Sequence, residues 1–137
     1  MSASIRPIEY FTTTFHGAPE QAYALLGQLA GAGVNLLAFN AIPVGLQATQ
    51  LVLFPEEADR LTHLASEQRL DLAGPDRAFL ISGDDELGLL ARMHEKLSAA
   101  GVHPYASTGV TDGRGGFGYV VYVRKEQFGA AARALAV

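Results

Sequence analysis

Apolar residues recur at helical spacing in four stretches of the chain, and short apolar runs typical of strands separate these stretches. Clusters of glycine and proline mark the turns between neighbouring runs. The pattern predicts helices over Pro19–Ala32, from Pro55 onward, over Leu87–Ala100 and over Lys125–Ala136. It predicts strands over Ile8–Phe15, Val34–Ile42, Ala48–Phe54, Leu70–Ala73, Arg77–Ser82, Val102–Val110 and Phe117–Val123.

The helix expected over Leu87–Ala100 has the clearest start and end signals. Asp84 or Asp85 is a suitable N-cap, because a carboxylate accepts hydrogen bonds from the first free amides of a helix. Gly101 suits the helix end, where the backbone often turns left-handed. The face expected to pack on a sheet holds Leu90, Met93, Leu97 and Ala100.

This helix and its flanks occur twice, because Gly33 and Gly101 lie 68 residues apart within corresponding sequences. The turn over Thr111–Gly116 is expected to be two residues longer than its counterpart, so that the last helices correspond at a separation of 70. A repeat of this length has the size of a small domain rather than of a solenoid unit. We therefore expect two domains, 1–74 and 75–137, with a seam at Gly74-Pro75-Asp76.

Each expected domain has the order strand, helix, strand, strand, helix, and the first adds a fourth strand that the second lacks. Right-handed crossovers between such elements give an antiparallel sheet with both helices on one face. The expected fold class is therefore α+β, with ferredoxin-like βαββαβ units in tandem.

Composition narrows the classes of function. Hydrophobic residues make up 49% of the chain, which indicates a globular protein, and the net charge of −4 argues against nucleic acid as a partner. There is no cysteine, hence no disulfide and no thiolate metal site. The N-terminal sequence lacks the apolar core of a signal peptide, and no apolar run approaches membrane-spanning length. We expect a cytoplasmic protein with no membrane partner.

Residues suited to catalysis form no recognisable constellation. The four histidines fall in four different elements without metal-ligand spacing, so we expect no catalytic residue, no metal and no cofactor. Gly113–Gly118 fits the G-x-G-x-x-G pattern of dinucleotide-binding loops letter for letter. That pattern requires a helix after the loop, whereas this loop joins two expected strands.

An alternative function rests on Gly116–Tyr122, which matches most positions of the ribonucleoprotein motif of RNA-recognition motifs. On this interpretation Phe79, Phe117 and Tyr119 would form a platform on which RNA bases stack. Against it, Gly115 stands where that motif begins with a basic residue, and Ala48–Phe54 in the first half carries nothing similar.

The turn before the repeated helix resembles that of ACT domains, small βαββαβ regulatory modules in which Asp-Arg-Pro-Gly precedes an apolar segment. Asp85–Ala91 retains the aspartate, the glycine and the apolar segment but lacks the arginine and proline, while Gly17–Glu20 retains only the proline. The resemblance covers about Ile8–Leu135 and extends to the layout of small free-standing tandem ACT proteins.

This resemblance implies a non-enzymatic protein that senses an amino acid or similar zwitterion between paired domains. Independently of it, the edge strands left by the short second half and the limited core of each half favour sheet pairing within the chain and in a homodimer. Gly88 would let a ligand approach the backbone, with its carboxylate near the Gly88 or Leu89 amide and its ammonium held by Asp85 or by a backbone carbonyl. Valine at position 88 is expected to be tolerated by the fold. The implied ligand-binding residues are Asp84, Asp85, Leu87, Gly88, Leu89, Val102 and His103, with Gly17, Val34 and Asn35 in the first half. The alternative is that both turns only cap their helices.

Overall fold

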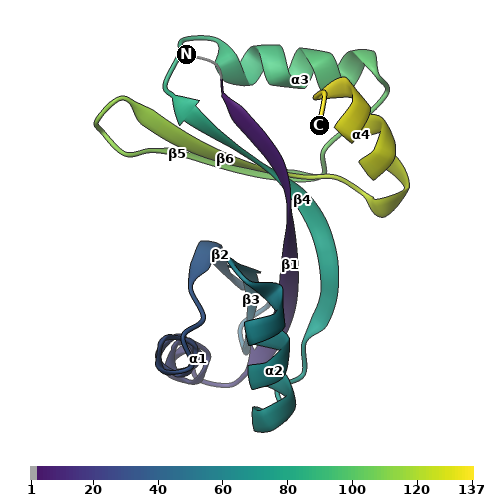
Figure 1. Ribbon diagram of the computed structural model, residues 1–137. Helices are drawn as coiled ribbons and strands as arrows, with labels where there is room; N and C mark the ends of the chain where they lie inside the picture. Colours follow the sequence, from purple (N-terminus) through teal and green to yellow (C-terminus); the bar gives the residue numbers. More distant parts are fainter. Residues whose placement is uncertain (1–2) are drawn as a thin grey trace. The chain divides into compact units, whose positions relative to one another are not determined.

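The computed structural model describes residues 3–137 and shows two compact units (Figure 1). One unit is Glu9–Asp76, and the other combines Arg77–Val137 with the start of the chain as far as Ile8. The expected division into 1–74 and 75–137 differs from these units by two residues at the seam. It differs more at the start of the chain, which belongs to the same unit as the second half.

The first unit contains two helices and the strands that they cover. Its sheet has the order β2-β3-β1-β4, with antiparallel pairing of β1 with β3 and of β3 with β2. Its elements are β1 (Ser4–His16), α1 (Pro19–Gly31), β2 (Leu36–Pro43), β3 (Ala48–Pro55), α2 (Ala58–Gln68) and the beginning of β4 (Ala73–Asp84).

The second unit repeats this arrangement. Its sheet has the order β1-β4-β6-β5, and β6 pairs antiparallel with both β4 and β5. After β4 come α3 (Leu89–Ala99), β5 (Ala106–Thr111), β6 (Gly116–Tyr122), a 3₁₀ turn (Lys125–Gln127) and α4 (Phe128–Ala134).

The expected ferredoxin-like topology is confirmed in both units, and the duplication extends to strand register. Phe11 lies opposite Leu53 as Phe79 lies opposite Val121, which preserves the separation of 68 residues on both strands. The two α-helix exits also match, because the Val34 amide donates to the Leu29 carbonyl at 2.8 Å. The corresponding bond in the second unit, from the Val102 amide to the Leu97 carbonyl, measures 2.9 Å.

The expectation that the second hairpin turn is two residues longer is wrong. The Val44 amide donates to the Ala48 carbonyl, and the Asp112 amide donates to the Gly116 carbonyl, so both turns have the same length. The two additional residues lie instead between β6 and α4, where the 3₁₀ turn Lys125–Gln127 has no counterpart before α2. Leu53 and Val121 lie on the strands between these two places and keep the separation of 68 residues, so the additional residues must follow β6.

The expected seam at Gly74-Pro75-Asp76 lies at the boundary between the units, but no turn or linker marks it, because β4 continues through these residues without a break. The backbone at Gly74 has φ +125°, and a side chain there would approach the Tyr10 carbonyl oxygen to 2.9 Å. Glycine is therefore required by the close passage of β4 along β1. Pro75 is tolerated since this end of β4 is an edge strand of the first unit. The strand expected at Leu70–Ala73 begins only at Ala73.

The start of the chain provides the fourth strand that the second half of the sequence lacks. The first residues of β1 lie beside β4 in the strand order, within the unit of Arg77–Val137. Ala3 and Ile5 pack against the core of that unit. Both units thus have four strands and two helices, but only the first, Glu9–Asp76, is a continuous segment of the sequence, whereas the second takes its fourth strand from the start of the chain.

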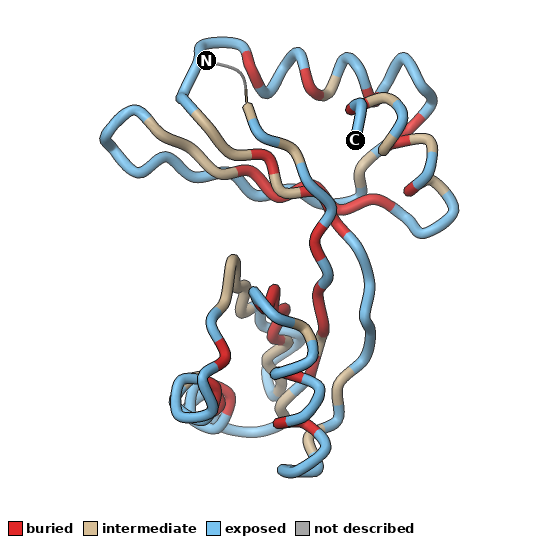
Figure 2. The backbone as a smooth tube through the Cα atoms, viewed as in Figure 1, coloured by how far each residue is buried: buried red, intermediate tan, exposed pale blue. Residues whose placement is uncertain are grey.

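Each unit has its own apolar core between its helices and one face of its sheet (Figure 2). In the first unit the core holds Phe11, Ala22, Leu25, Leu29, Val34, Leu51, Leu53, Leu61 and Leu64. In the second it holds Phe79, Ile81, Leu89, Met93, Leu97, Val102, Tyr119, Val121, Val123, Phe128, Ala131 and Leu135.

The buried face of α3 differs from the expected one. Leu89, Met93 and Leu97 are buried, whereas Leu90 is 43% exposed and Ala100 is exposed. The reason is that α3 begins at Leu89 instead of Leu87, after a turn that directs Leu89 inward.

We expect Ile5→Ala to lower the free energy of unfolding by roughly 1–2 kcal/mol, because it removes half-buried methyl groups from the core of the second unit. Amide hydrogen exchange should become faster at Phe79 and Val121, which are more than 70 residues away in the sequence. Arg6→Ala, at an exposed neighbouring position, is the control. Unchanged stability and exchange in Ile5→Ala would contradict the assignment of the chain start to this unit.

Candidate functional site

The turn between β4 and α3 is built differently from the expected cap. Asp84 ends β4, and the Asp85 amide donates to the Gly115 carbonyl at 2.6 Å, which ties the turn to the β5–β6 hairpin. Gly88 occupies the N-cap position of α3 with φ +82°, and no side chain caps the helix. The expectation that Asp84 or Asp85 is the N-cap is therefore wrong.

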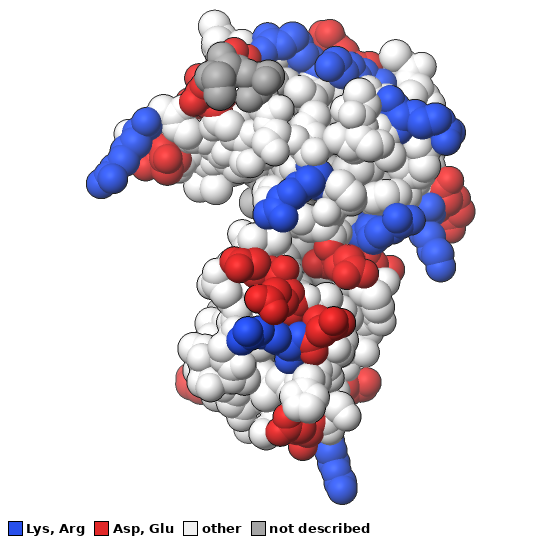
Figure 3. Space-filling model, in the orientation of Figure 1, with Lys and Arg blue, Asp and Glu red and all other residues white. Residues whose placement is uncertain are grey.

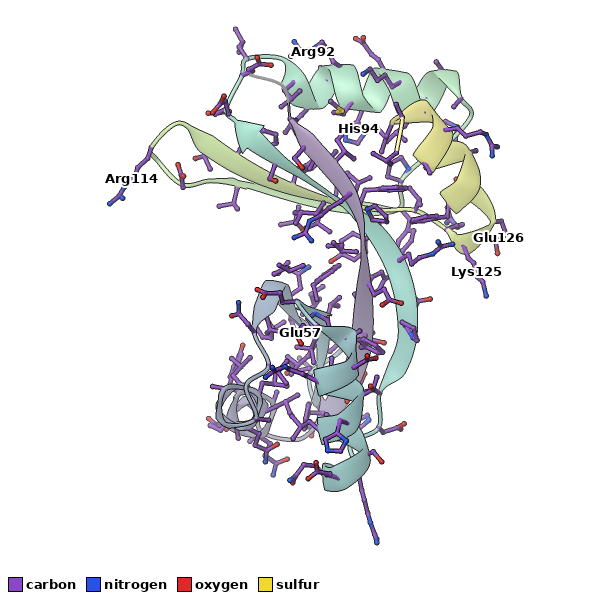
Figure 4. All side chains as sticks on the ribbon, viewed as in Figure 1. Glu57, Arg92, His94, Arg114, Lys125 and Glu126 are labelled. Carbon is purple, nitrogen blue, oxygen red and sulfur yellow. The ribbon has the colours of Figure 1, made fainter. Side chains whose placement is uncertain are left out.

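Arg92 holds this turn together, and the sequence did not single it out. Its Nη2 lies 2.9 Å from the Glu86 carboxylate, and its Nη1 donates to the Leu87 carbonyl at 3.4 Å. Figure 4 shows Arg92 at the end of α3 that follows the turn. Glu86 and Arg92 are six residues apart, which is not a helical contact spacing, so no periodic pattern indicated the pair. The guanidinium brings a positive charge to an otherwise acidic turn.

The free amides at the start of α3 are not those expected. The Leu89 amide already donates to the Glu86 carbonyl at 3.2 Å, and the first helical bond runs from the Arg92 amide to the Gly88 carbonyl. The first-turn amides of Leu90 and Ala91 therefore remain available as donors for an anionic group.

A hollow of about 280 Å³ lies over this turn, between the start of α3 and β5. It is lined by Asp85, Glu86, Leu89, Leu90, Gly109, Val110, Thr111 and Phe117. A neighbouring hollow of about 500 Å³ shares Val110, Thr111 and Phe117 with it and continues along the β5–β6 hairpin. Carboxylates, a hydroxyl and apolar side chains thus converge around one space of small-ligand size.

Asp112 shapes the hairpin beside this hollow. Its carboxylate accepts hydrogen bonds from the Arg114 amide at 2.6 Å and the Gly116 amide at 3.1 Å. These bonds, the one from Arg114 first, hold the pKa of the Asp112 carboxyl below its ordinary value. Arg114 itself points away from the tip of the hairpin (Figure 4).

The residues expected from the start of the second strand are not brought to this turn within the unit. Val102 is buried in the core, and His103 follows the far end of α3, whose eleven residues extend about 16 Å. The His103 amide donates to Gln127 Oε1 at 3.4 Å, and Gln127 Nε2 donates to the Gly101 carbonyl at 3.1 Å. His103 therefore borders the beginning of α4.

In the first unit, too, the expected site residues lie at opposite ends of a helix, here α1. Gly17 precedes α1 and donates its amide to the Gln47 carbonyl at 2.7 Å, while Val34 is buried at the far end of the helix. Asn35 Nδ2 donates to the Glu56 carboxylate at 2.9 Å. Because Pro19 is the first residue of α1, the first turn of this helix has one amide donor fewer than α3.

A separate hollow of about 540 Å³ lies between α1 and α2 of the first unit, at the end of α1 opposite Gly17. The sequence did not indicate it. Its lining is mostly polar, comprising Gln28, Gly31, Ala32, Arg60, His63, Leu64, Glu67 and Gln68.

The expected platform for RNA bases is not formed. Phe79 is fully buried, Tyr119 is 5% exposed and Phe117 packs against the same core, so all three lie under the helices. Tyr119 also forms a hydrogen bond between its hydroxyl and His94 Nε2. In Figure 3 basic side chains are more frequent over the second unit and acidic ones over the first, and acidic side chains separate the basic ones, unlike the continuous basic stripe that RNA binding favours.

Comparisons with solved structures confirm the fold. The chain is similar to a protein from Bacteroides thetaiotaomicron, with 14% identity, a TM-score of 0.82, and coverage of 96% of this chain and 88% of that one. It is also similar to the regulatory subunit of aspartate kinase from Thermus thermophilus, with 15% identity, a TM-score of 0.61, and coverage of 99% and 95%. A structure of aspartokinase alpha and beta subunits matches at 14% identity, with a TM-score of 0.60 and coverage of 98% and 95%.

These likenesses confirm the ACT-type fold that the sequence resemblance indicated. A comparison with protein families found no match, and neither did a comparison with curated protein sequences. Within residues 3–137, no helix is long and apolar enough to cross a membrane. Over the same residues, no group of three histidine, aspartate or glutamate side chains is arranged to hold a metal ion.

The positive φ of Gly88 corrects the expectation that valine is tolerated there. We expect Gly88→Val to lower the free energy of unfolding by about 1–2 kcal/mol, with or without a ligand, because a side chain is strained in the left-handed region. Gly27→Val is the matched control, since Gly27 lies within α1 and has open space around it. Chemical denaturation compares the two, and equal stability of Gly88→Val and the parent protein would contradict this backbone assignment.

Proposed function

We propose that this chain is a non-enzymatic, cytoplasmic regulatory protein whose second unit binds an amino acid or similar zwitterion. The observation that supports this most strongly is the hollow over the β4–α3 turn, where the carboxylates of Asp85 and Glu86 lie beside apolar side chains. The ligand would bind at one site per chain, in the second unit only.

A zwitterion suits the charges around this hollow. Its ammonium group would pair with the Asp85 carboxylate on the rim, because Glu86 is already engaged by Arg92. Its carboxylate would accept hydrogen bonds from the Leu90 and Ala91 amides at the positive end of α3. A purely anionic metabolite would meet Asp85 and Glu86 without bringing a cation of its own.

The regulatory part of this proposal draws on the fold. Similar solved structures include regulatory subunits of aspartate kinase, and the match covers nearly the whole of both chains. Regulation by such a protein requires that ligand binding changes its affinity for a partner, since a ligand shifts an equilibrium only through differential binding. The partner would be an enzyme or a regulator that contacts this chain.

We also propose a homodimer formed through β5. This strand ends the strand order of its unit, and all six of its residues, Ala106–Thr111, are exposed. It contains no charged residue and no proline, the features that usually protect an edge strand from pairing. The edge strand of the first unit, β2, has a shift in its pairing register between Leu36 and Ala38 and ends at Pro43.

We expect at least one of the standard amino acids to bind the parent protein in isothermal titration calorimetry. Asp85→Asn should weaken this binding at least tenfold, because the amide no longer neutralises the ligand ammonium. Glu126→Gln is the matched control, since it removes one carboxylate in the same unit away from the hollow (Figure 4). Succinate and phosphate should not bind. Tight binding of these anions, or no binding of any amino acid, would contradict the proposal.

Light scattering after size-exclusion chromatography tests the dimer. We expect the parent protein to elute as a dimer and Thr108→Lys to elute as a monomer, because the strands would then bring two like charges together. Thr62→Lys, on an exposed face of α2, is the control. A monomeric parent protein, or a dimer in Thr108→Lys, would show that β5 is not the interface.

A further inference from the structure

The hollow over the β4–α3 turn has two chemically different ends. Asp85 and Glu86 line the end at the turn, whereas Leu89, Leu90 and Phe117 line the remainder together with β5. The Glu86 carboxylate is paired with Arg92, whose Nη2 lies at 2.9 Å, so a ligand cation is expected to pair with Asp85 in preference to Glu86. The site therefore offers one place for a positive charge.

The apolar end is not filled by the protein itself. Leu90 remains 43% exposed, although it follows the buried Leu89 directly, and Phe117 is only partly buried. Gly109 lies on the same face of the sheet as Tyr119 and carries no side chain that could occupy the space; an added Cβ would approach Tyr119 Cδ1 to 3.0 Å. An apolar ligand group bound there would remove from water both its own apolar surface and that of Leu90 and Phe117.

We infer that the ligand is an amino acid with a neutral, apolar side chain about the size of leucine or phenylalanine. This inference rests on the proposed function and specifies the class of its ligand. The ammonium pairs with Asp85, the carboxylate lies at the Leu90 and Ala91 amides, and the side chain packs against Leu90 and Phe117. The volume of about 280 Å³ suits a ligand smaller than most drug-sized molecules.

Charged side chains are disfavoured by the same arrangement. The side-chain ammonium of lysine would lie at the apolar end without a carboxylate, because Asp85 already holds the α-ammonium and Glu86 holds Arg92. The side-chain carboxylate of glutamate would lose water there, and the residues that line the hollow include no cationic side chain to pair with it. Glycine would fit but would leave Leu90 and Phe117 exposed.

Isothermal titration calorimetry with L-leucine, L-phenylalanine, L-lysine, L-glutamate and glycine tests the inference on the full-length protein. We expect leucine or phenylalanine to bind at least tenfold more tightly than lysine, glutamate and glycine. Leu90→Asp should weaken leucine binding at least tenfold and strengthen lysine binding, because it places a carboxylate at the apolar end. Leu46→Asp is the matched control, since Leu46 is fully exposed in the first unit and should leave all affinities unchanged.

The outcomes separate this inference from the proposed function. If lysine, glutamate or glycine binds the parent protein as tightly as leucine and phenylalanine, the apolar class is wrong while an amino-acid site remains. If leucine binds Leu90→Asp as tightly as the parent protein, Leu90 does not contact the side chain and the inference is likewise overturned. If none of the standard amino acids binds, the proposed function fails together with this inference.

Discussion

Two strands, β1 and β4, each contribute one end to each compact unit, and the rest of the fold depends on this sharing. The start of β1 is an edge strand of the second unit, and the start of β4 is an edge strand of the first. The sheet of the second unit needs the start of β1, which is distant in the sequence, so a chain cut after Asp76 would leave Arg77–Val137 without its fourth strand. At Gly74 the backbone of β4 passes so close to the Tyr10 carbonyl of β1 that there is no room for a side chain.

The two units share the same backbone topology because of the duplication, but their helix starts and side chains differ. Both units tie the residue after their first strand to the following hairpin, through the Gly17 amide in one and the Asp85 amide in the other. In the first unit the helix then starts directly with Pro19, whereas in the second Gly88 delays the start to Leu89. This delay leaves Leu90 at the surface and forms a turn that Glu86 and Arg92 hold together. The asymmetry favours one ligand site per chain.

The periodic pattern predicted the elements, the duplication and the ferredoxin-like class, because burial on one face of a helix or sheet imposes a period on the sequence. It could not predict contacts that have no period. The pairing of Glu86 with Arg92 crosses a helix start, and the inward direction of Leu89 depends on the φ of Gly88. The alternation of residues along a strand does not reveal which face of the sheet the helices cover. For this reason the sequence allowed Phe79 and Tyr119 to lie on a solvent-exposed face, whereas both are buried. The expected roles of Val102, His103, Val34 and Asn35 in ligand binding stay predictions.

The central claim is that the ligand site lies over the β4–α3 turn of the second unit. The most direct measurement is a titration of ¹⁵N-labelled protein with L-leucine, followed by the amide signals in two-dimensional NMR spectra. The account predicts that the largest shifts occur at Leu90, Ala91 and Thr111, with little change at Gln21 in the first unit. Largest shifts at Gln21, or around His63 in the hollow between α1 and α2, would contradict it.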